Sequence, residues 1–306
     1  MTYIIKSYQE EFLDAQEQVG REVTKNWTPF IQTPAEQLKQ IYSQPDFDPE
    51  TRHYCFKNSK LVGFLTSSVL EEAEKVKKAN LEFPLVLPGH EEAEQLLFEK
   101  ALKILRKKGA NVIRTRVSES WGKTVEMAER WGYTFAEKLA ECYRIHINAA
   151  DIKEIPDTDI TAYHHQRDLE QMVTIFVTEY DMTPEQAHFN FESLEKAGDK
   201  VVAHLVMRKD GEIAGRALAL RDDYNPHQAY TGALYVTQEE QRKLFLTKIL
   251  LICKEKGIKM LDTTIFGNLL SMKDQLAALY TSLGFDHIAT VSYYEKEIPD
   301  LLRKEL

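Results

Sequence analysis

Residues 268–285 read NLLSMKDQLAALYTSLGF, and they are the most informative part of the chain. Their apolar side chains recur at the spacing of one helical face, which predicts an amphipathic helix. The positions on that face are Met272, Leu276, Leu279, Tyr280 and Leu283. Gly284 then supplies the left-handed residue that commonly ends a helix. A β-rich run follows at His287–Tyr294, so the stretch is read as the last helix of an α/β unit before a closing strand.

The elements before this helix alternate in type. An opening helix is predicted from the apolar spacing of residues 169–177. A hairpin follows at Val201–Met207 and Glu212–Leu220, because its Asp-Gly turn tolerates the positive φ that a tight hairpin needs. The remaining elements before the last helix are the strand Gln228–Val236, the helix Glu239–Lys256 ended by Gly257, and the strand Ile258–Ile265.

The first half of the chain repeats this order at a distance of roughly 150 residues, as an internal repeat does. Its predicted elements are an opening helix near 12–23, a hairpin at 53–56 and 61–70, a strand at 81–87, a helix at 90–108 ended by Gly109, a strand at 111–117, a helix ending in Trp131-Gly132-Tyr133, and a strand at 140–147. Unrelated α/β domains also share strand–helix–strand units, but here element order, lengths and helix caps agree along most of both halves. Asn148–Asp159 is interpreted as the linker, with the boundary near residue 150.

This plan, and the last helix above all, resembles the GNAT acyltransferase superfamily. In that family the last helix follows an Asn and ends in Leu-Tyr-x-x-x-Gly-Phe, as Asn268 and the run to Phe285 do here. Tandem GNAT proteins such as mycothiol synthase have the same two-copy plan. The resemblance implies an α/β (α+β) fold of two tandem GNAT-like domains, each a central mixed β-sheet flanked by helices. Residues 1–150 would be a degenerate, non-catalytic domain, and residues 151–306 the domain that binds acetyl-CoA and carries the chemistry.

The resemblance also implies a binding site for acetyl-CoA as co-substrate. GNAT enzymes hold the pantetheine arm on a strand that splays from its neighbour, and a loop Gln/Arg-x-x-Gly-x-Gly/Ala holds the pyrophosphate at a helix N-terminus, where free N–H groups attract anions. The matching contacts in this chain are Tyr235, Val236, Gln241, Arg242, Lys243, Leu244, Leu246, Thr247 and Asn268. Asn268 has an alternative reading as a helix N-cap.

Two leucines depart from the family's loop. Leu244 and Leu246 stand where glycine would let the backbone approach the phosphates. The alternative reading places Leu246 on a core-facing helical stripe. The first copy departs further, because three glutamates (Glu91, Glu92 and Glu94) satisfy the dipole of its helix and would repel a pyrophosphate.

The chemistry implied is acetyl transfer to an amine, which needs a deprotonated amine, an oxyanion stabiliser and an acid for the leaving thiolate. Tyr280 has the position of the tyrosine that meets the CoA sulfur in GNAT enzymes, and a phenol stays protonated at neutral pH. Its alternative role is that of a core tyrosine. Ala128 has the same place in the first copy and cannot supply the acid. The base is left open among His227, Glu239, Tyr230 and Tyr235.

Composition narrows the remaining choices. The net charge of −9 disfavours nucleic acid, whose phosphates need a basic face. No apolar run approaches the ~20 residues that span a bilayer, and the polar segment after the start is not typical of a signal peptide, so a cytoplasmic protein without a membrane partner is expected. Three cysteines without a CxxC pair, and the pair His164-His165 without spaced acids, predict no metal site.

The sequence therefore predicts a CoA-dependent N-acyltransferase that acts on a small-molecule amine in its second half. Its oligomeric state is left open. The competing class is a non-catalytic binding module that keeps the fold but has lost productive acetyl-CoA binding.

Overall fold

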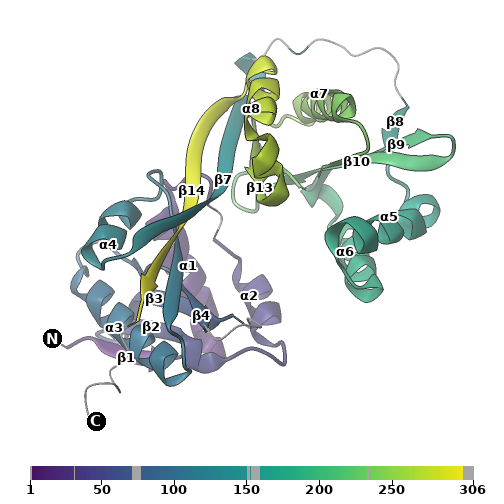
Figure 1. The fold of residues 1–306 in the computed structure, drawn as a ribbon. Coiled ribbons are helices and arrows are strands. Elements are labelled where there is room, and N and C mark those ends of the chain that lie inside the picture. Colours follow the sequence, from purple (N-terminus) through teal and green to yellow (C-terminus); the bar gives the residue numbers. More distant parts are fainter. Residues whose placement is uncertain are drawn as a thin grey trace. The chain divides into compact units, whose positions relative to one another are not determined.

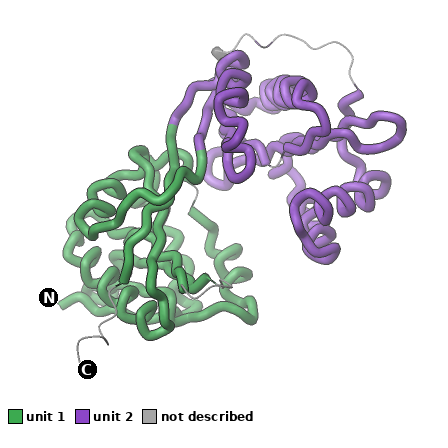
Figure 2. The backbone as a smooth tube through the Cα atoms, in the orientation of Figure 1, with its two compact units in different colours: residues 1–140, 289–306 green, residues 141–288 purple. Residues whose placement is uncertain are grey.

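The computed structural model describes residues 2–30, 32–70, 77–149, 152, 159–232 and 234–298. The chain divides into two units, residues 1–140 with 289–306 and residues 141–288, which Figure 2 shows in green and purple. Much of the predicted linker Asn148–Asp159 lies outside the described residues. No helix of the part that is described combines the length and apolar character needed to cross a membrane.

The first unit is built on a mixed sheet with strand order β1-β2-β3-β4-β6-β14. Its β4 and β6 run parallel, and the other pairs are antiparallel. Its elements, most of which are labelled in Figure 1, are β1 (Ile4–Ser7), α1 (Leu13–Thr24), α2 (Ala35–Tyr42), β2 (Arg52–Lys57), β3 (Lys60–Val69), β4 (Lys78–Leu81), β5 (Leu85–Val86), α3 (Glu92–Lys107), β6 (Val112–Val117) and α4 (Thr124–Arg130).

The second unit has the corresponding order β7-β13-β11-β10-β9-β8, in which β7 is Thr134–His146, and its β11 and β13 again run parallel. Its elements are β8 (Ile160–Ala162), α5 (His165–Tyr180), α6 (Pro184–Lys196), β9 (Val201–Lys209), β10 (Glu212–Arg221), β11 (Gln228–Thr231), β12 (Tyr235–Val236), α7 (Glu239–Glu255), β13 (Met260–Phe266) and α8 (Lys273–Ser282).

The repeat extends to single residues. Gly63 of β3 pairs with Val86 of β5, and Gly215 of β10 pairs with Val236 of β12. In each unit the strand predicted as continuous is broken in two. Its first part lies in the parallel ladder, and its second part pairs with β3 or β10. The predicted fold of two mixed sheets flanked by helices is confirmed.

The closing strands cross between the units. β7 (Thr134–His146) begins in the first unit and ends in the second, and β14 (Asp286–Glu297) does the reverse. Within the first unit, Ser292–Glu297 pair with β6. Within the second, Arg144 on β7 bonds Asp262 on β13 through two N–H groups at 2.7 and 2.8 Å. Because of this exchange, the residue ranges of the two units differ from the expected ranges 1–150 and 151–306. Strand periodicity alone does not predict such an exchange, because it does not indicate which sheet a strand joins.

Each unit packs one long helix on its sheet. α7 contributes Phe245, Leu246, Ile249, Leu250 and Cys253, all at most 1% exposed. The corresponding face of α3 is equally buried. Full burial of such a side chain contributes about 1.5–3 kcal/mol, so these two faces hold the helices in place.

Four elements have no counterpart in the sequence prediction. These are the short outer strands β1 and β8, and the second helices α2 and α6. β8 has only three residues, which is too short for a period-2 pattern to be read. α6 is marked by a capping box, in which Thr183 and Gln186 each bond the other's backbone N–H. That signal, with Pro184 at the first helical position, could have predicted the helix.

His53 on β2 makes the stability of the first unit depend on pH. It is 1% exposed, and within the described part of the chain neither ring nitrogen has a hydrogen-bond partner. Burial, with smaller contributions from the charges of Lys100 and Arg52, lowers the pKa of His53 to about 4. The unfolded chain takes up a proton near pH 6.5 and the folded chain does not, so stability is complete above that pH and is lost as the pH falls toward 4.

We expect His53→Phe to flatten this dependence. Between pH 7 and pH 5 the wild type should lose about 2 kcal/mol more unfolding free energy than the variant. Urea denaturation at a series of pH values measures the difference. Parallel curves for the two proteins would contradict the assignment.

Candidate functional site

A strand that leaves its neighbour forms the frame of the candidate site in the second unit. The parallel ladder between β11 and β13 ends at the pair Tyr230 and Asp262. Further along, β12 pairs with β10, while β13 continues to Phe266. The hydroxyl of Thr231 donates to that of Thr263 at 2.8 Å, where the two strands part. This divergence is the geometry that the predicted pantetheine site at Tyr235 and Val236 requires.

Tyr280 lies beside this divergence. Its ring packs against Tyr143 and Phe285 with centroids 5.2 and 5.7 Å away, and its hydroxyl lies close enough to Thr263 on β13 for that side chain to influence the pKa of the phenol. The side chain is 4% exposed, and burial raises the pKa of its phenol. The group is therefore protonated at neutral pH and able to donate. Tyr280 also belongs to the hydrophobic core, so its surroundings fit both a general acid and a core tyrosine. Its catalytic role stays a prediction.

The predicted pyrophosphate loop is helical. α7 begins at Glu239, so Gln241–Thr247 form its first turns and do not precede it. Gln238 and Gln241 bond each other at this helix start in the manner of a capping box: the backbone N–H of Gln238 donates to Gln241 Oε1 at 3.2 Å, and the backbone N–H of Gln241 donates to the carbonyl of Gln238 at 3.1 Å. Donors that a phosphate would use are thus partly satisfied within the helix.

The two cations of this segment differ in their surroundings. Arg242 is 4% exposed and donates to both carboxylate oxygens of Glu239, at 2.9 and 3.1 Å. Lys243 is exposed. Glu239 and Glu240 occupy the first turn of α7, where acidic groups satisfy the helix dipole. The argument that disfavours a pyrophosphate at the first copy's helix therefore applies to the second copy as well.

The other segment residues serve the helix and its core. Leu246 is 1% exposed in the core, and Leu244 is partly buried against it. The hydroxyl of Thr247 donates to the carbonyl of Lys243 at 2.8 Å. Their contribution to CoA binding stays a prediction, and the alternative reading of Leu246 as a core residue describes its position.

Asn268 and the candidate bases are spread over the unit. Asn268 is exposed in a 3-10 turn, Gly267–Met272, and Met272 is the N-cap of α8, so Asn268 is not the cap. His227 faces the carbonyl of Gly257 at 3.3 Å, just beyond the C-terminus of α7, and so lies at the opposite end of that helix from Glu239. Tyr230 and Tyr235 lie on β11 and β12, and burial raises the pKa of both phenols.

The corresponding helix of the first unit begins after a loop closed by its own acid. Glu91 accepts from the backbone N–H of Gly89 at 3.0 Å, and backbone hydrogen bonds lower the pKa of its carboxyl. Glu94 pairs with Arg130 at 2.8 Å. Ala128 is completely buried. These contacts agree with a structural helix in this position.

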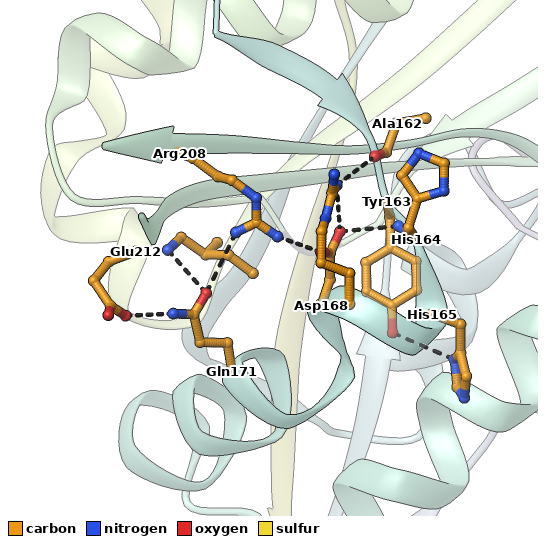
Figure 3. A network of polar contacts seen from close by, with 10 residues as sticks. Ala162, Tyr163, His164, His165, Asp168, Gln171, Arg208 and Glu212 are labelled. Carbon is orange, nitrogen blue, oxygen red and sulfur yellow. Dashed lines mark hydrogen bonds and ion pairs between the residues drawn. The ribbon is translucent and has the colours of Figure 1, made fainter. Parts of the chain in front are cut away.

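The histidine pair His164-His165 adjoins a buried carboxylate (Figure 3). Asp168, which is 0% exposed, accepts from the backbone N–H of His164 at 2.9 Å and pairs with Arg167 and Arg208. Burial favours its neutral form, but these donors and charges outweigh burial and lower the pKa of Asp168. His165 instead contacts the hydroxyl of Tyr163 at 3.4 Å. The carboxylate thus anchors the start of α5 to β9, and among the described residues no group of three potential ligands is placed to hold a metal.

A cavity in the first unit was not predicted from the sequence. It has a volume of about 430 Å³ and lies between α1, α2 and the sheet. Its wall includes Trp27, Phe30, Arg52, Glu82, Arg116 and Trp121. Trp27, Phe30 and Trp121 lie in segments outside helices and strands, where aromatic side chains are an indication of binding that sequence reasoning could have used.

Comparison with known proteins identifies the class by fold. No family model and no curated protein sequence matches the chain. Among solved structures, a GCN5-related N-acetyltransferase from Sphaerobacter thermophilus aligns with a TM-score of 0.66 at 12% identity, over 97% of this chain and 96% of that one. A tandem GNAT protein from the clavulanic acid biosynthesis pathway aligns with a TM-score of 0.68 at 15% identity, over 98% of this chain and 100% of that one.

A more distant neighbour has the same fold. N-myristoyltransferase from Saccharomyces cerevisiae, solved with bound myristoyl-CoA and inhibitors, aligns with a TM-score of 0.56 at 12% identity, over 96% of this chain and 80% of that one. These identities are low, so the likeness shows the fold. The chain has the fold of the GNAT acetyltransferases, and its two units correspond to the tandem form of that fold.

The close approach of α7 to β10 gives a test of the frame. A Cβ atom on Gly215 would lie 2.5 Å from Cε2 of Phe245 and 3.4 Å from the carbonyl oxygen of Tyr235. We expect Gly215→Ala to lower the unfolding free energy by about 1–3 kcal/mol, because the added carbon overpacks the helix–strand contact. Phe245→Leu in the same chain should recover part of the loss. Denaturant unfolding of both single variants and the double variant measures the coupling, and strictly additive losses would contradict the contact.

Proposed function

We propose that this protein transfers an acyl group, most simply acetyl, from an acyl-CoA to the amine of a small molecule, and that the second unit carries out the transfer. The observation that supports this best is the position of the Tyr280 phenol near Thr263 of β13, beside the point where β12 and β13 part. The fold neighbours add support, since they include N-acetyltransferases and an acyltransferase solved with myristoyl-CoA. A cytoplasmic location, with neither nucleic acid nor membrane as partner, belongs to the same proposal.

In the proposed reaction the amine nitrogen attacks the thioester carbonyl carbon directly. The C–N bond forms, the C–S bond breaks, and the departing thiolate takes the proton of the Tyr280 hydroxyl. The nitrogen gives up the extra proton that it carries after the attack, and the Tyr280 phenolate regains a proton directly from it or through solvent, so the free thiol, the amide and the phenol are the products. The phenol is suited to this step because burial keeps it protonated. The free edge of β12 at Tyr235 and Val236 would pair with the amide groups of the pantetheine arm, which orients the thioester toward Tyr280.

The second candidate function is a binding module without catalysis, and the N-terminus of α7 favours it. Gln241 and Arg242 are engaged with Gln238 and Glu239, so the segment expected to hold pyrophosphate is occupied by its own neighbours. In this case the fold would be kept for a ligand other than acyl-CoA. Binding and turnover measurements separate the two candidates.

Tyr280→Phe tests the acid. The substitution keeps the ring that packs on Tyr143 and Phe285 and removes only the hydroxyl. General acid catalysis is worth about 10²–10⁴-fold, so kcat should fall by that factor while the affinity for acetyl-CoA changes little. Release of free CoA thiol, followed with a panel of small amines, measures the rate.

Tyr143→Phe is the matched control. Tyr143 is a neighbouring tyrosine on β7 and is 6% exposed. Its substitution by phenylalanine removes the same hydroxyl group, but from a residue that lies on neither β13 nor α8. It should turn over at nearly the wild-type rate. If Tyr280→Phe is equally active, Tyr280 is a core residue and the binding-module candidate gains.

Glu239→Gln tests whether CoA reaches the start of α7. The change removes a negative charge from the helix N-terminus and releases Arg242 from its ion pair. Affinity for acetyl-CoA should rise by a few-fold to about tenfold, the scale of a charge at a helix end. Isothermal titration calorimetry measures the affinity.

Glu255→Gln, at the C-terminal end of the same helix, is the control and should leave the affinity unchanged. Absence of acetyl-CoA binding by both the wild type and Glu239→Gln would contradict the acyltransferase proposal and support the binding module.

A further inference from the structure

The cavity of the first unit has an uncompensated cation in its wall. Arg52 donates to the hydroxyl of Thr51 at 2.8 Å and to the carbonyl of Ser67, and no carboxylate of the described residues pairs with it. Its guanidinium carbon lies 4.9 Å from the ring centroid of Tyr42, which fixes its orientation. The other two charges of the wall neutralise each other, because Arg116 donates to Glu82 at 2.9 and 3.1 Å.

Two donors in the same wall have no acceptor. The Nε–H of Arg52 and the Nε1–H of Trp121 are buried, and neither has a hydrogen-bond partner among the residues that the structure describes. A buried donor without an acceptor is destabilising, and a ligand that brings an acceptor oxygen removes this cost. Both unpartnered groups are hydrogen-bond donors, so a ligand that binds beside them should carry an acceptor.

The rest of the wall is aromatic. The rings of Trp27 and Trp121 are nearly parallel, 6° apart in orientation, with centroids at 5.8 Å, and Phe30 meets both rings edge-on. Phe83 and Phe64 also line the space. Polar side chains nearby are already engaged: Gln16 accepts from Tyr54 at 2.7 Å and donates to Tyr42 at 3.3 Å. The volume of about 430 Å³ falls within the range of small-molecule pockets, about 300–1,000 Å³.

We infer that this cavity is a binding site for a small carboxylate with an apolar or aromatic body. The carboxylate lies against Arg52 and the N–H of Trp121, and the body packs on the rings of Trp27, Phe30 and Phe83. The first unit is then a ligand-binding unit in its own right and does more than support the second. This site is independent of acyl transfer, because every residue that forms it belongs to the first unit.

Binding of phenylacetate and phenylpropionate to the full chain, without acyl-CoA, tests the inference. Two of the three tryptophans, Trp27 and Trp121, line the cavity, so saturable change of tryptophan fluorescence reports occupancy and calorimetry gives the affinity. The carboxylates should bind at millimolar concentration or below, and phenethylamine, which has a similar body and the opposite charge, should not. Because CoA is absent, the result does not depend on the proposed function of the second unit.

Three variants locate the site. Arg52→Met and Trp121→Phe should each weaken carboxylate binding by about tenfold or more, the scale of a hydrogen bond to a charged group. Trp131→Phe is the matched control: Trp131 is not among the described residues that line the cavity, although its ring lies 5.8 Å from that of Phe83. It stacks on Phe98 at 4.1 Å and donates to Gln95, so its loss should leave the affinity nearly unchanged. Thermal melting shows that each variant is folded, and Trp121→Phe carries the test if Arg52→Met is unstable.

Glu82→Gln adds a test of charge, since it releases Arg116 and should keep or tighten carboxylate binding. The inference is overturned if phenethylamine binds and the carboxylates do not, or if neither binds at millimolar concentration. It is also overturned if the carboxylates bind equally well to Trp121→Phe and to the wild type.

Discussion

A strand that changes partner half-way along its length is the constraint on which each unit depends. Its first part (β4 or β11) completes a parallel ladder, and its second part (β5 or β12) stays only with the hairpin strand beside it. The hairpin strand carries a glycine at that place. A Cβ on Gly63 would lie 2.8 Å from Val86, and one on Gly215 would lie 2.5 Å from Phe245. Close approach at these glycines lets the strand bend away, and the two diverging strands then frame whatever site the unit has.

The same frame is filled differently in the two units. Residues of the two hairpins can be matched by their distance from these glycines. Phe64 and Arg216 each follow the glycine directly, and Arg52 and His204 each pair with the residue three positions after it. In the second unit Arg216 is 2% exposed, donates to His204 at 3.1 Å and lies over the rings of Phe176 on α5 and Phe191 on α6. In the first unit Arg52 lines an open cavity beneath α1 and α2.

Sequence reasoning could predict what periodicity and caps encode. The helix at 239–256 and the hairpin at 201–220 were recognisable because their signals are local, and the structure has them within one or two residues. The exchange of β7 and β14 could not be predicted from the sequence. An alternating pattern indicates that a segment forms a strand, but it does not indicate which sheet the strand joins. The cavity also escaped, because Arg52, Glu82 and Trp121 come from distant segments and only the folded chain brings them together.

The start of α7 shows why a motif match alone was a weak guide to the second unit. Gln241 and Arg242 occupy the family's positions, but the helix begins two residues earlier, and Glu239, Glu240 and the capping box use the charge and donors that a pyrophosphate would need. Substituting the loop glycines by leucine permits this, because a sequence without glycine continues a helix more readily. An acyl-CoA bound here would therefore depend chiefly on the edge of β12 and on Tyr280, with little contribution from its phosphates. Such binding would vary less with salt than binding through phosphate contacts, since exposed charge pairs are what salt screens.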